Sequence, residues 1–350
     1  MKPLVSIVMP AYNAEAWIAE SLQSAVTQTW QRKEIIVVDD GSTDRTAEVA
    51  RQFASRNVAV FSTENRGLSA AVNHGIQRCQ GDYIQELDSD DLLAPDKIEK
   101  QLEALQKVGS KRILASSPWG HFYYRTRHTR FVPNSLWQDL SPAEWLLRKL
   151  GEDLHMQNAT WLVSRELAEA AGPWNEDLQY DQDGEYFARV VRASEGIRFV
   201  SEGRIYYRVS GSNQLSYIGA SNRKKDSLFR SMKLHIQYLR SLEESDRVRK
   251  ACVIYMQTWY PHFYPDRPDI VAELQDLAAE LQGHLKPPRF DWKYEWLKPV
   301  FGWRAAAAAE RFFAGLKTSL IRRWDNTMYR LETRFTSLVP PTAVNLNQRD

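Results

Sequence analysis

The sequence predicts an α/β protein in which a mostly parallel sheet is flanked by helices and followed by an α-helical C-terminal extension. Over the first hundred residues, short apolar runs alternate with amphipathic segments, the connections are short, and two of the runs end in adjacent aspartates. Such alternation is typical of parallel strands joined by right-handed helical crossovers. Apolar strands that end in acids indicate a sheet whose carboxyl edge opens into a ligand crevice.

The pattern of apolar residues predicts the order of elements. Strands are expected at 5–9, 35–38, 58–61 and 83–87, with helices after Asn13, a candidate N-cap, and at 44–54 and 68–79. Farther along, strands are expected at 113–117 and 204–209 and helices at 142–150, 165–171 and 182–193. Helices dominate from about residue 222 onward. We therefore expect a catalytic domain of residues 1–220 and a helical region of residues 221–350.

Composition narrows the class of protein. With 43% hydrophobic and 26% charged residues, the chain has the make-up of an ordinary globular protein. Its formal net charge of +2 gives no overall field for binding nucleic acid, so no nucleic-acid partner is expected. Cys79 and Cys252 are far apart and lack metal-ligand spacing, which argues for a reducing compartment. Without a recognisable signal peptide or a run of roughly 18 apolar residues, we expect a cytoplasmic protein.

Two acidic strings follow predicted strands and indicate where chemistry takes place. They are Asp39-Asp40 and Asp88-Ser89-Asp90-Asp91. Like charges this close raise each other's pKa unless a cation compensates, which suggests a divalent metal or a cationic ligand. Ser42 and Asp44 supply capping groups for the next helix and leave Asp40 available to a ligand. Asp39 is expected to be a supporting residue, and Asp91 to cap the following turn.

Four ordered segments resemble the family 2 glycosyltransferases of GT-A fold. They are residues 5–13 (VSIVMPAYN), 36–44 (IVVDDGSTD), 65–75 (NRGLSAAVNHG) and 81–91 (GDYIQELDSDD). The resemblance covers roughly residues 3–215 and implies a GT-A, Rossmann-like fold. It also implies an inverting hexosyltransferase in polysaccharide biosynthesis. Such an enzyme moves a sugar from a nucleotide-linked donor, here expected to be UDP-linked, to a hydroxyl of a glycan or lipid-linked glycan.

The resemblance implies roles for single residues in donor binding. The nucleotide-binding residues expected from it are Pro10, Ala11, Tyr12 and Asn13 around the uridine, Glu15 nearby, Asp40 on the base, Asn73 in the third motif, Asp88 on the ribose, and Ser89. Asp90, the last residue of the DxD signature, is expected to bind Mg²⁺ or Mn²⁺, which neutralises the leaving diphosphate. Val72 stands where the family often has arginine, and Arg66 is a candidate replacement.

A general base must take the proton from the attacking acceptor hydroxyl. In the family this base is an aspartate that opens a helix, and residues 172–189 resemble that stretch, which makes Asp183 the candidate base. Gln182 stands where the family usually has glutamate. Asp181 and Glu185 lie within a helical turn of Asp183, so the assignment of the base among these acids stays open. Acids are also common at helix N-termini for electrostatic reasons alone.

Other residues near these motifs have two interpretations each. Trp174 is a candidate for the floor of the acceptor site or a core residue, and His155 is expected to be a surface or packing residue. Arg208 and Ser212, in a stretch that resembles the family's closing loop, are candidates for contacts with the diphosphate.

Two alternative functions share some of these features. A sugar nucleotidyltransferase also combines an α/β domain with Mg²⁺, but it should carry an early glycine-rich, basic loop, which residues 10–13 do not form. A phosphorelay receiver domain also places an acid pair at a strand end and a further aspartate after a later strand. That interpretation leaves residues 130–350 unexplained.

Residues 291–335 interleave aromatic and basic side chains. Apolar residues recur there at helical spacing, at Phe312, Phe313, Leu316, Leu320 and Trp324. This pattern fits a helix in peripheral contact with the cytoplasmic face of a membrane, where a lipid-linked acceptor would lie. It fits equally a helix that packs on the catalytic domain or forms a homo-oligomer.

Overall fold

The computed structural model describes residues 2–209, 218–219, 221–287 and 318–332. The chain divides into two compact units, one of residues 1–121 with 130–288 and one of residues 122–129 with 289–350. The candidate phosphate contact Ser212 and most of the aromatic and basic segment 291–335 lie outside the described residues. In the described ranges, no helix is long and apolar enough to span a bilayer.

A five-stranded sheet forms the centre of the first unit. Its order is β3 (Val58–Thr63), β2 (Lys33–Asp40), β1 (Val5–Ala11), β4 (Tyr83–Glu86) and β9 (Val163–Ser164). The pairs β3–β2, β2–β1 and β1–β4 are parallel, and β4–β9 is antiparallel. Every residue of β1 is buried, as predicted for a parallel strand covered on both faces. The four predicted strands are therefore confirmed, and β2 extends through both of its aspartates.

Helices connect these strands and cover the sheet. They are α1 (Ile18–Val26), α2 (Thr46–Arg51), α3 (Leu68–Ile76) and α4 (Lys97–Val108), and the last of these was not predicted. The expected cap of α1 is wrong, because Asn13 lies four residues before Trp17, the residue at the N-cap. Asn13 adopts a left-handed backbone (φ 49°), and its side-chain oxygen accepts a hydrogen bond from the backbone N–H of Thr43 instead.

Two small sheets extend the central one. A parallel pair joins β6 (Ile113–Ser116) to β10 (Gly196–Phe199), and a four-stranded sheet has the order β5 (Leu92–Leu93), β11 (Ile205–Arg208), β7 (Trp119–Phe122) and β8 (Arg130–Phe131). The strands predicted at 113–117 and 204–209 correspond to β6 and β11. Through β5 and β11, the chain that follows the DxD motif is joined to the strand that ends at Arg208.

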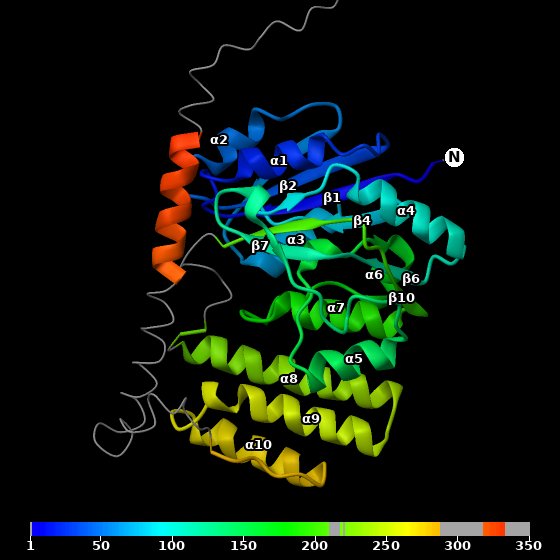
Figure 1. Ribbon diagram of the computed structural model, residues 1–350, viewed down its shortest axis with the longest axis vertical. Helices are drawn as coiled ribbons and strands as arrows, with labels where there is room; N and C mark the ends of the chain where they lie inside the picture. The colour runs from blue at the N-terminus through cyan, green and yellow to red at the C-terminus, as the bar shows by residue number, and fades with distance from the viewer. Residues whose placement is uncertain (1, 210–217, 220, 288–317, 333–350) are drawn as a thin grey trace, which may run out of the picture. The chain divides into compact units, whose positions relative to one another are not determined.

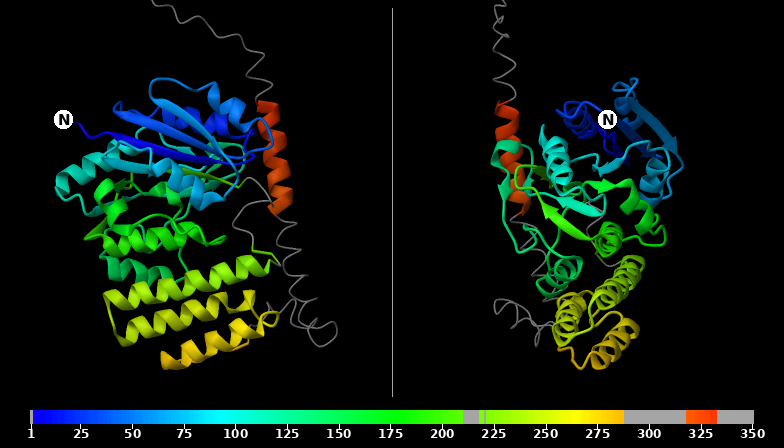
Figure 2. Two further views of the ribbon diagram at one scale, coloured as in Figure 1. Left: turned by 180° about the vertical axis from the view of Figure 1, so that it is seen from behind. Right: turned by 90° about the vertical axis from the view of Figure 1, so that its right-hand side faces the viewer.

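The remaining helices surround and extend this core. They are α5 (Pro142–Gly151), α6 (Arg165–Ala171), α7 (Gln182–Ala193), α8 (Asn222–Leu242), α9 (Asp246–Trp259) and α10 (Pro268–Glu280), with single 3-10 turns η1 (Thr126–His128), η2 (Asn158–Thr160) and η3 (Tyr260–His262). Within the first unit, α8 lies next to α5 and α7, and α9 and α10 follow it in succession (Figures 1 and 2). Buried residues of α7, α8 and α9 belong to one hydrophobic cluster, so residues 222–287 share a core with the sheet domain.

We expect Gly75→Ala to destabilise the protein. A Cβ at Gly75 of α3 would lie 2.5 Å from Val8 Cγ1 and 3.4 Å from Val38 Cγ2, side chains on the two central strands. The overlap outweighs the gain in helix propensity, and we expect a net loss of about 1–2 kcal/mol in the free energy of unfolding, measured with urea. Gln77→Ala, an exposed change at the end of the same helix, is the control and should stay within about 0.5 kcal/mol. Equal stability of Gly75→Ala and wild type would contradict the packing argument.

Candidate active site

The loops after β1 and β2 are tied together at the carboxyl edge of the sheet. Asn13 Oδ1 accepts from the Thr43 N–H (2.8 Å), and the Asn13 N–H donates to Ser42 Oγ (3.0 Å). The Glu15 carboxylate accepts from the backbone N–H of Arg45 (3.1 Å) and pairs with its guanidinium (3.2 Å). Asn13 and Glu15, both predicted to lie at the uridine, are thus fixed by the neighbouring loop.

Pro10 and Ala11 lie inside β1 and not in the loop after it, where we expected them. Both are buried, and they pair with Val38 and Asp39 of β2. Proline is tolerated in this central strand because the pairing with β4 ends at Val8, so the missing N–H interrupts no ladder. Only the backbone of these two residues can line a pocket. Tyr12, which follows directly, is 52% exposed.

Asp40 holds the loop that precedes α3. Its two carboxylate oxygens accept hydrogen bonds from the backbone N–H groups of Arg66 (2.9 Å) and Gly67 (2.8 Å). The expectation that this carboxylate is free for a ligand is therefore wrong in part. Oδ1 also accepts a long hydrogen bond from the Thr63 hydroxyl (3.5 Å), and the contact of Asp40 with a base stays a prediction. Asp39 accepts from the Ser42 N–H (3.3 Å), in line with the supporting role expected for it.

Asn73 binds the segment that leads to α7. Its side-chain N–H₂ donates to the Trp174 carbonyl (3.0 Å) and to Glu176 Oε1 (2.9 Å), and its oxygen accepts from the Trp174 N–H (2.8 Å). Arg66, the candidate replacement for the arginine missing at Val72, pairs with Glu176 (2.8 Å). The third motif is thus bonded to residues 174–176, and a nucleotide contact by Asn73 stays a prediction.

The DxD motif forms a turn directly after β4. The Asp91 N–H donates to the Asp88 carbonyl (3.2 Å), and Asp88 Oδ1 accepts from the side chain of Asn158 (3.0 Å). Asp91 does not cap the following turn. Its fully buried carboxylate accepts from the Gln157 side chain (2.6 Å) and the Arg208 N–H (2.8 Å), because burial requires partners for both oxygens.

Asp183, in the first turn of α7, is close to the acids after β4. Burial, followed by the charges of Asp90 and Asp183, raises the pKa of Asp88 to about 7. Burial also raises the pKa of Glu86, and Asp88 and Asp183 raise it further. The candidate base and the DxD motif, which are far apart in the sequence, therefore act on each other electrostatically.

The carboxylates at this edge fit a divalent cation. The described residues contain no set of three or more His, Cys, Asp or Glu side chains arranged to hold a metal on their own. Mg²⁺ is commonly bound through one or two carboxylates together with substrate phosphates. A cation shared between Asp90 and a diphosphate would relieve the repulsion that raises the pKa of Asp88.

The buried side chain of Arg208 supports the DxD turn. Only 1% of its surface is exposed, and its guanidinium donates to the Asp90 carbonyl (2.8 Å) and pairs with Glu20 (2.6 Å). It also lies over the ring of Trp17, 4.5 Å from the centroid. The expected contact of Arg208 with a diphosphate is therefore not supported by its burial.

Trp174 is a core residue, in accordance with one of its two interpretations. It is buried, stacks on Tyr186 with 4.8 Å between ring centroids, and donates its indole N–H to Glu86 (3.1 Å). This hydrogen bond gives the buried carboxyl a partner on one oxygen. In the described part of the chain, the other oxygen of Glu86 has no hydrogen-bond partner.

A cluster of rings lies beside the acids. Trp119 packs edge-on against His121 (4.8 Å), His155 (5.5 Å) and Tyr207 (5.9 Å). Burial raises the pKa of Tyr207, and the charges of the DxD aspartates and Asp183 raise it further. His155 therefore packs in a ring cluster near the site. Sequence reasoning missed this cluster, as well as Glu86 and Asn158, because their common feature is spatial and no motif joins them.

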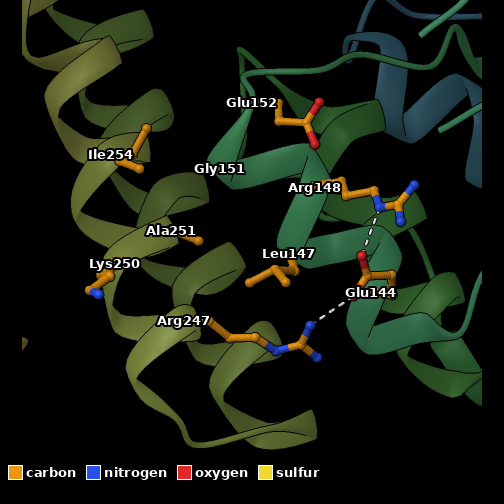
Figure 3. Close-up of a pocket in the computed structure, with 9 residues that line it drawn as sticks. All are labelled: Glu144, Leu147, Arg148, Gly151, Glu152, Arg247, Lys250, Ala251 and Ile254. Carbon is orange, nitrogen blue, oxygen red and sulfur yellow. Dashed lines mark hydrogen bonds and ion pairs between the residues drawn. The ribbon is translucent and has the colours of Figure 1, made fainter. Parts of the chain in front are cut away.

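A separate groove of about 430 Å³ lies between α5 and α9 (Figure 3). Three of its charged side chains pair with one another, since Glu144 bonds to Arg148 (2.7 Å) and Arg247 (2.9 Å). No residue predicted from the sequence to act in the site lines this groove.

Structural comparison defines the class of fold. The structure of Staphylococcus aureus TarS residues 1–349 in complex with UDP-GlcNAc is similar, with a TM-score of 0.61, 19% identity and coverage of 79% of each chain. The mannosyltransferase PcManGT of Pyrobaculum calidifontis, in complex with GDP-Man and Mn²⁺, has a TM-score of 0.53 at 18% identity, over 94% of this chain and 85% of that one. The fold is thus that of the GT-A glycosyltransferases, as predicted.

The sequence comparison defines the family. Residues 6–170 match the model of glycosyl transferase family 2. An uncharacterized glycosyltransferase of Rickettsia typhi is 32% identical over 55% of this chain, and the uncharacterized glycosyltransferase EpsJ of Bacillus subtilis is 30% identical over 59% of it. Residues 6–170 thus match glycosyl transferase family 2, and both relatives are named glycosyltransferases, which confirms the resemblance of the motifs. The chain spans 60% and 62% of the lengths of these two relatives. The family match gives no support to the nucleotidyltransferase or receiver-domain alternatives.

We expect Glu86→Gln to change how stability depends on pH. Burial raises the pKa of Glu86 well above its usual 4.5, so the folded protein holds this proton more tightly than the unfolded chain. The wild type therefore loses stability through Glu86 as the pH rises above about 4.5, at up to about 1.4 kcal/mol per pH unit until the folded group ionises. Below that pH, this contribution is constant. The variant keeps an acceptor for Trp174 and removes the loss.

Urea unfolding of both proteins between pH 4 and 8 measures this effect. The difference in the free energy of unfolding should grow in favour of Glu86→Gln as the pH rises. Glu280→Gln, at an exposed position on α10, is the control and should give a constant difference. A constant difference for Glu86→Gln would show that Glu86 is not held neutral in the folded protein.

Proposed function

We propose that this protein is an inverting glycosyltransferase that moves a sugar from a UDP-linked donor to a hydroxyl of a glycan or lipid-linked glycan. The proposal is supported by the nearness of Asp183, at the start of α7, to the DxD turn after β4, where the charge of Asp183 contributes to the raised pKa of Asp88. An acceptor hydroxyl between these groups would have a base on one side and the donor on the other. Neighbours of the same fold have been crystallised with UDP-GlcNAc and with GDP-Man and Mn²⁺.

The donor would lie along the carboxyl edge of β1, β2 and β4. The exposed ring of Tyr12 would stack on a base, and the backbone of Pro10 and Ala11 and the loop held by Asp40 would complete the pocket. Asn13, Glu15 and Asn73, which are hydrogen-bonded to neighbouring loops, would form its frame. Asp88 would meet the ribose, with Ser89 beside it.

Asp90 would hold the Mg²⁺ or Mn²⁺, with Asp88 adjacent. The metal supplies positive charge that neutralises the leaving diphosphate. Asp183 would accept the proton of the attacking hydroxyl, in the manner of a general base. Asp183 lies in the first turn of α7.

The helix of residues 318–332 supports peripheral contact with a membrane. Its buried side is acidic, because Asp325 is only 7% exposed and accepts from the guanidinium of Arg125 (2.7 Å) and the Tyr124 N–H (2.9 Å) within the second unit. Its apolar residues face solvent instead, and Trp324 is 66% exposed. The other exposed apolar residues of this helix are Leu320, Ile321, Tyr329 and Leu331.

A helix that packs on a protein core usually buries its apolar residues and exposes its charged ones, and in this helix the reverse holds. Exposed tryptophan, leucine and isoleucine side chains beside arginines such as Arg323 are typical of helices that lie in the interface of an anionic bilayer. We therefore propose that the protein works at the cytoplasmic face of a membrane and that its acceptor is lipid-linked. Formation of a homo-oligomer through this face is the competing explanation, which the vesicle experiment below separates.

We expect Asp183→Asn to lose turnover and keep donor binding. The test uses a panel of UDP-sugars with water as acceptor and measures released UDP, together with calorimetric titration of UDP with and without Mn²⁺. Removal of a general base lowers the rate by about 10²–10⁴-fold while UDP affinity stays within about twofold. Asp90→Asn should instead abolish the Mn²⁺ dependence of UDP binding.

Asp177→Asn, an exposed acid shortly before α7, is the matched control and should behave like wild type in both assays. Unchanged turnover in Asp183→Asn would remove this residue from the chemistry. Absence of UDP binding to the wild type, in the presence and absence of Mn²⁺, would overturn the assignment of a UDP-linked donor.

We expect the double variant Leu320→Ser/Trp324→Ser to lose vesicle binding. Wild type should sediment with vesicles of phosphatidylcholine that contain phosphatidylglycerol and bind much more weakly to phosphatidylcholine alone, because arginines contribute to the attraction. The variant should bind the anionic vesicles at least tenfold more weakly. Ile254→Ser, an exposed apolar residue of α9, is the control and should bind like wild type.

The same proteins are examined by analytical ultracentrifugation without vesicles. One adverse result is that wild type fails to bind anionic vesicles. The other is that wild type forms a dimer that the double variant abolishes, which would make the exposed face a contact between copies of the chain. Either result would contradict the membrane proposal.

A further inference from the structure

We propose that two serines of α8, Ser227 and Ser231, position Asp183 for catalysis, so that the helical region beyond residue 220 is part of the catalytic apparatus. The inference rests on the proposed function through the assignment of Asp183 as the base. It concerns the segment 179–181, which immediately precedes α7 and determines where that helix begins.

Ser227 binds the backbone of this segment with its full hydrogen-bonding capacity. Its hydroxyl oxygen accepts from the N–H groups of Gln179 (2.8 Å) and Tyr180 (2.9 Å), and its hydroxyl hydrogen is donated to the Tyr180 carbonyl (2.9 Å). A serine hydroxyl has one donor and two acceptor positions, and all three are used here. Ser227 is buried, so no water can replace these bonds without a change of structure.

Ser231, one helical turn later, binds the side chain of Asp181. Its hydroxyl donates to Asp181 Oδ2, and the serine is fully buried. Asp181 is the N-cap residue of α7, but its side chain caps no N–H of that helix, and its backbone is left-handed (φ 58°). The left-handed conformation is unfavourable for an L-residue, and the contact with α8 offsets this cost at Asp181.

His235, one helical turn further along α8, also lies near the carboxylate of Asp181. Its Nδ1 lies 3.8 Å from Asp181 Oδ2 and 2.9 Å from the Tyr255 hydroxyl of α9. Burial lowers the pKa of His235 to about 3, so the ring is neutral and forms no ion pair with Asp181. The serine hydroxyl is therefore the group on α8 that holds this carboxylate.

The position of Asp181 is transmitted directly to the turn that carries Asp183. A Cβ placed on Gly184 would lie 2.0 Å from Asp181 Oδ1, so the carboxylate fills the space that a side chain at 184 would need. Asp183 lies between these two residues in the sequence. A change in the hydrogen bond to Ser231 therefore moves the backbone on which the candidate base is mounted.

A few residues earlier in the chain, residues 174–176 are held by α3 through Asn73, which bonds to Trp174 and Glu176. Asp183 thus follows a stretch that is anchored at one end to the donor-binding half and at the other to α8. A misplacement of about 1 Å in a reacting group can lower turnover about 10²-fold without loss of binding. This is the effect expected when the α8 anchor is removed.

The experiment measures UDP binding and the kcat and KM of UDP-sugar hydrolysis in Ser227→Ala, Ser231→Ala and the double variant. We expect kcat to fall at least tenfold in the double variant, while KM and UDP affinity stay within about twofold. Asp181→Asn, which keeps an oxygen acceptor for Ser231, should retain most of the activity. Ser241→Ala is the matched control on α8, because its hydroxyl bonds only to the Tyr238 carbonyl of the same helix.

A further variant leaves the buried residues of α8 unchanged, so that a fall in kcat cannot be attributed to loss of folding. Asp181→Gly removes the carboxylate but accepts a left-handed backbone without strain, and it should show the same fall in kcat. Wild-type kcat in Asp181→Gly and in the double serine variant, with Asp183→Asn inactive, would overturn the positioning proposal alone. Full activity of Asp183→Asn would overturn the base assignment and the positioning proposal with it.

Discussion

The convergence of carboxylates at one edge of the sheet is the constraint on which the rest of this structure depends. Asp88, Asp91 and Glu86 are held among protein atoms that raise the pKa of each, and Asp183 approaches them from α7. The surrounding fold compensates with donors from several elements. They include Asn158 of the η2 turn, Gln157 directly before it, the Arg208 N–H of β11 and the indole of Trp174. The cluster persists because these groups stabilise it.

Much of the sheet could be predicted from the sequence, because the signal for it is local. A buried parallel strand is a short apolar run, and an acid pair at its end marks the functional edge, so β1, β2, β3 and β4 were found with their order along the chain. The exact ends were less certain. Pro10 and Ala11 were predicted to follow the strand, because proline is uncommon in a central strand. In the structure β1 continues through both residues, and this is possible because its pairing with β4 ends at Val8.

The partners of the site residues could not be predicted, because they come from distant parts of the chain. Asp40 was expected to be free, yet its oxygens accept from the N–H groups of Arg66 and Gly67. Arg208 was expected to contact the diphosphate, yet its side chain is buried against the DxD turn and pairs with Glu20. In both cases the sequence motif correctly indicated which part of the fold the residue lies in. The hydrogen bonds that form in the folded chain determine what its side chain contacts. A motif therefore identifies where a group lies better than it identifies what the group contacts.

The hydrogen bonds of Ser227 limit how this chain can be divided or recombined. The amides of Gln179 and Tyr180 have their partner on α8, so a fragment that stops near residue 220 would leave these groups without it. The family match ends at residue 170, well before either α7 or α8. A chimera between relatives should therefore transfer α7 and α8 together. The natural unit of exchange is this pair of helices and not the segment that the shared motifs define.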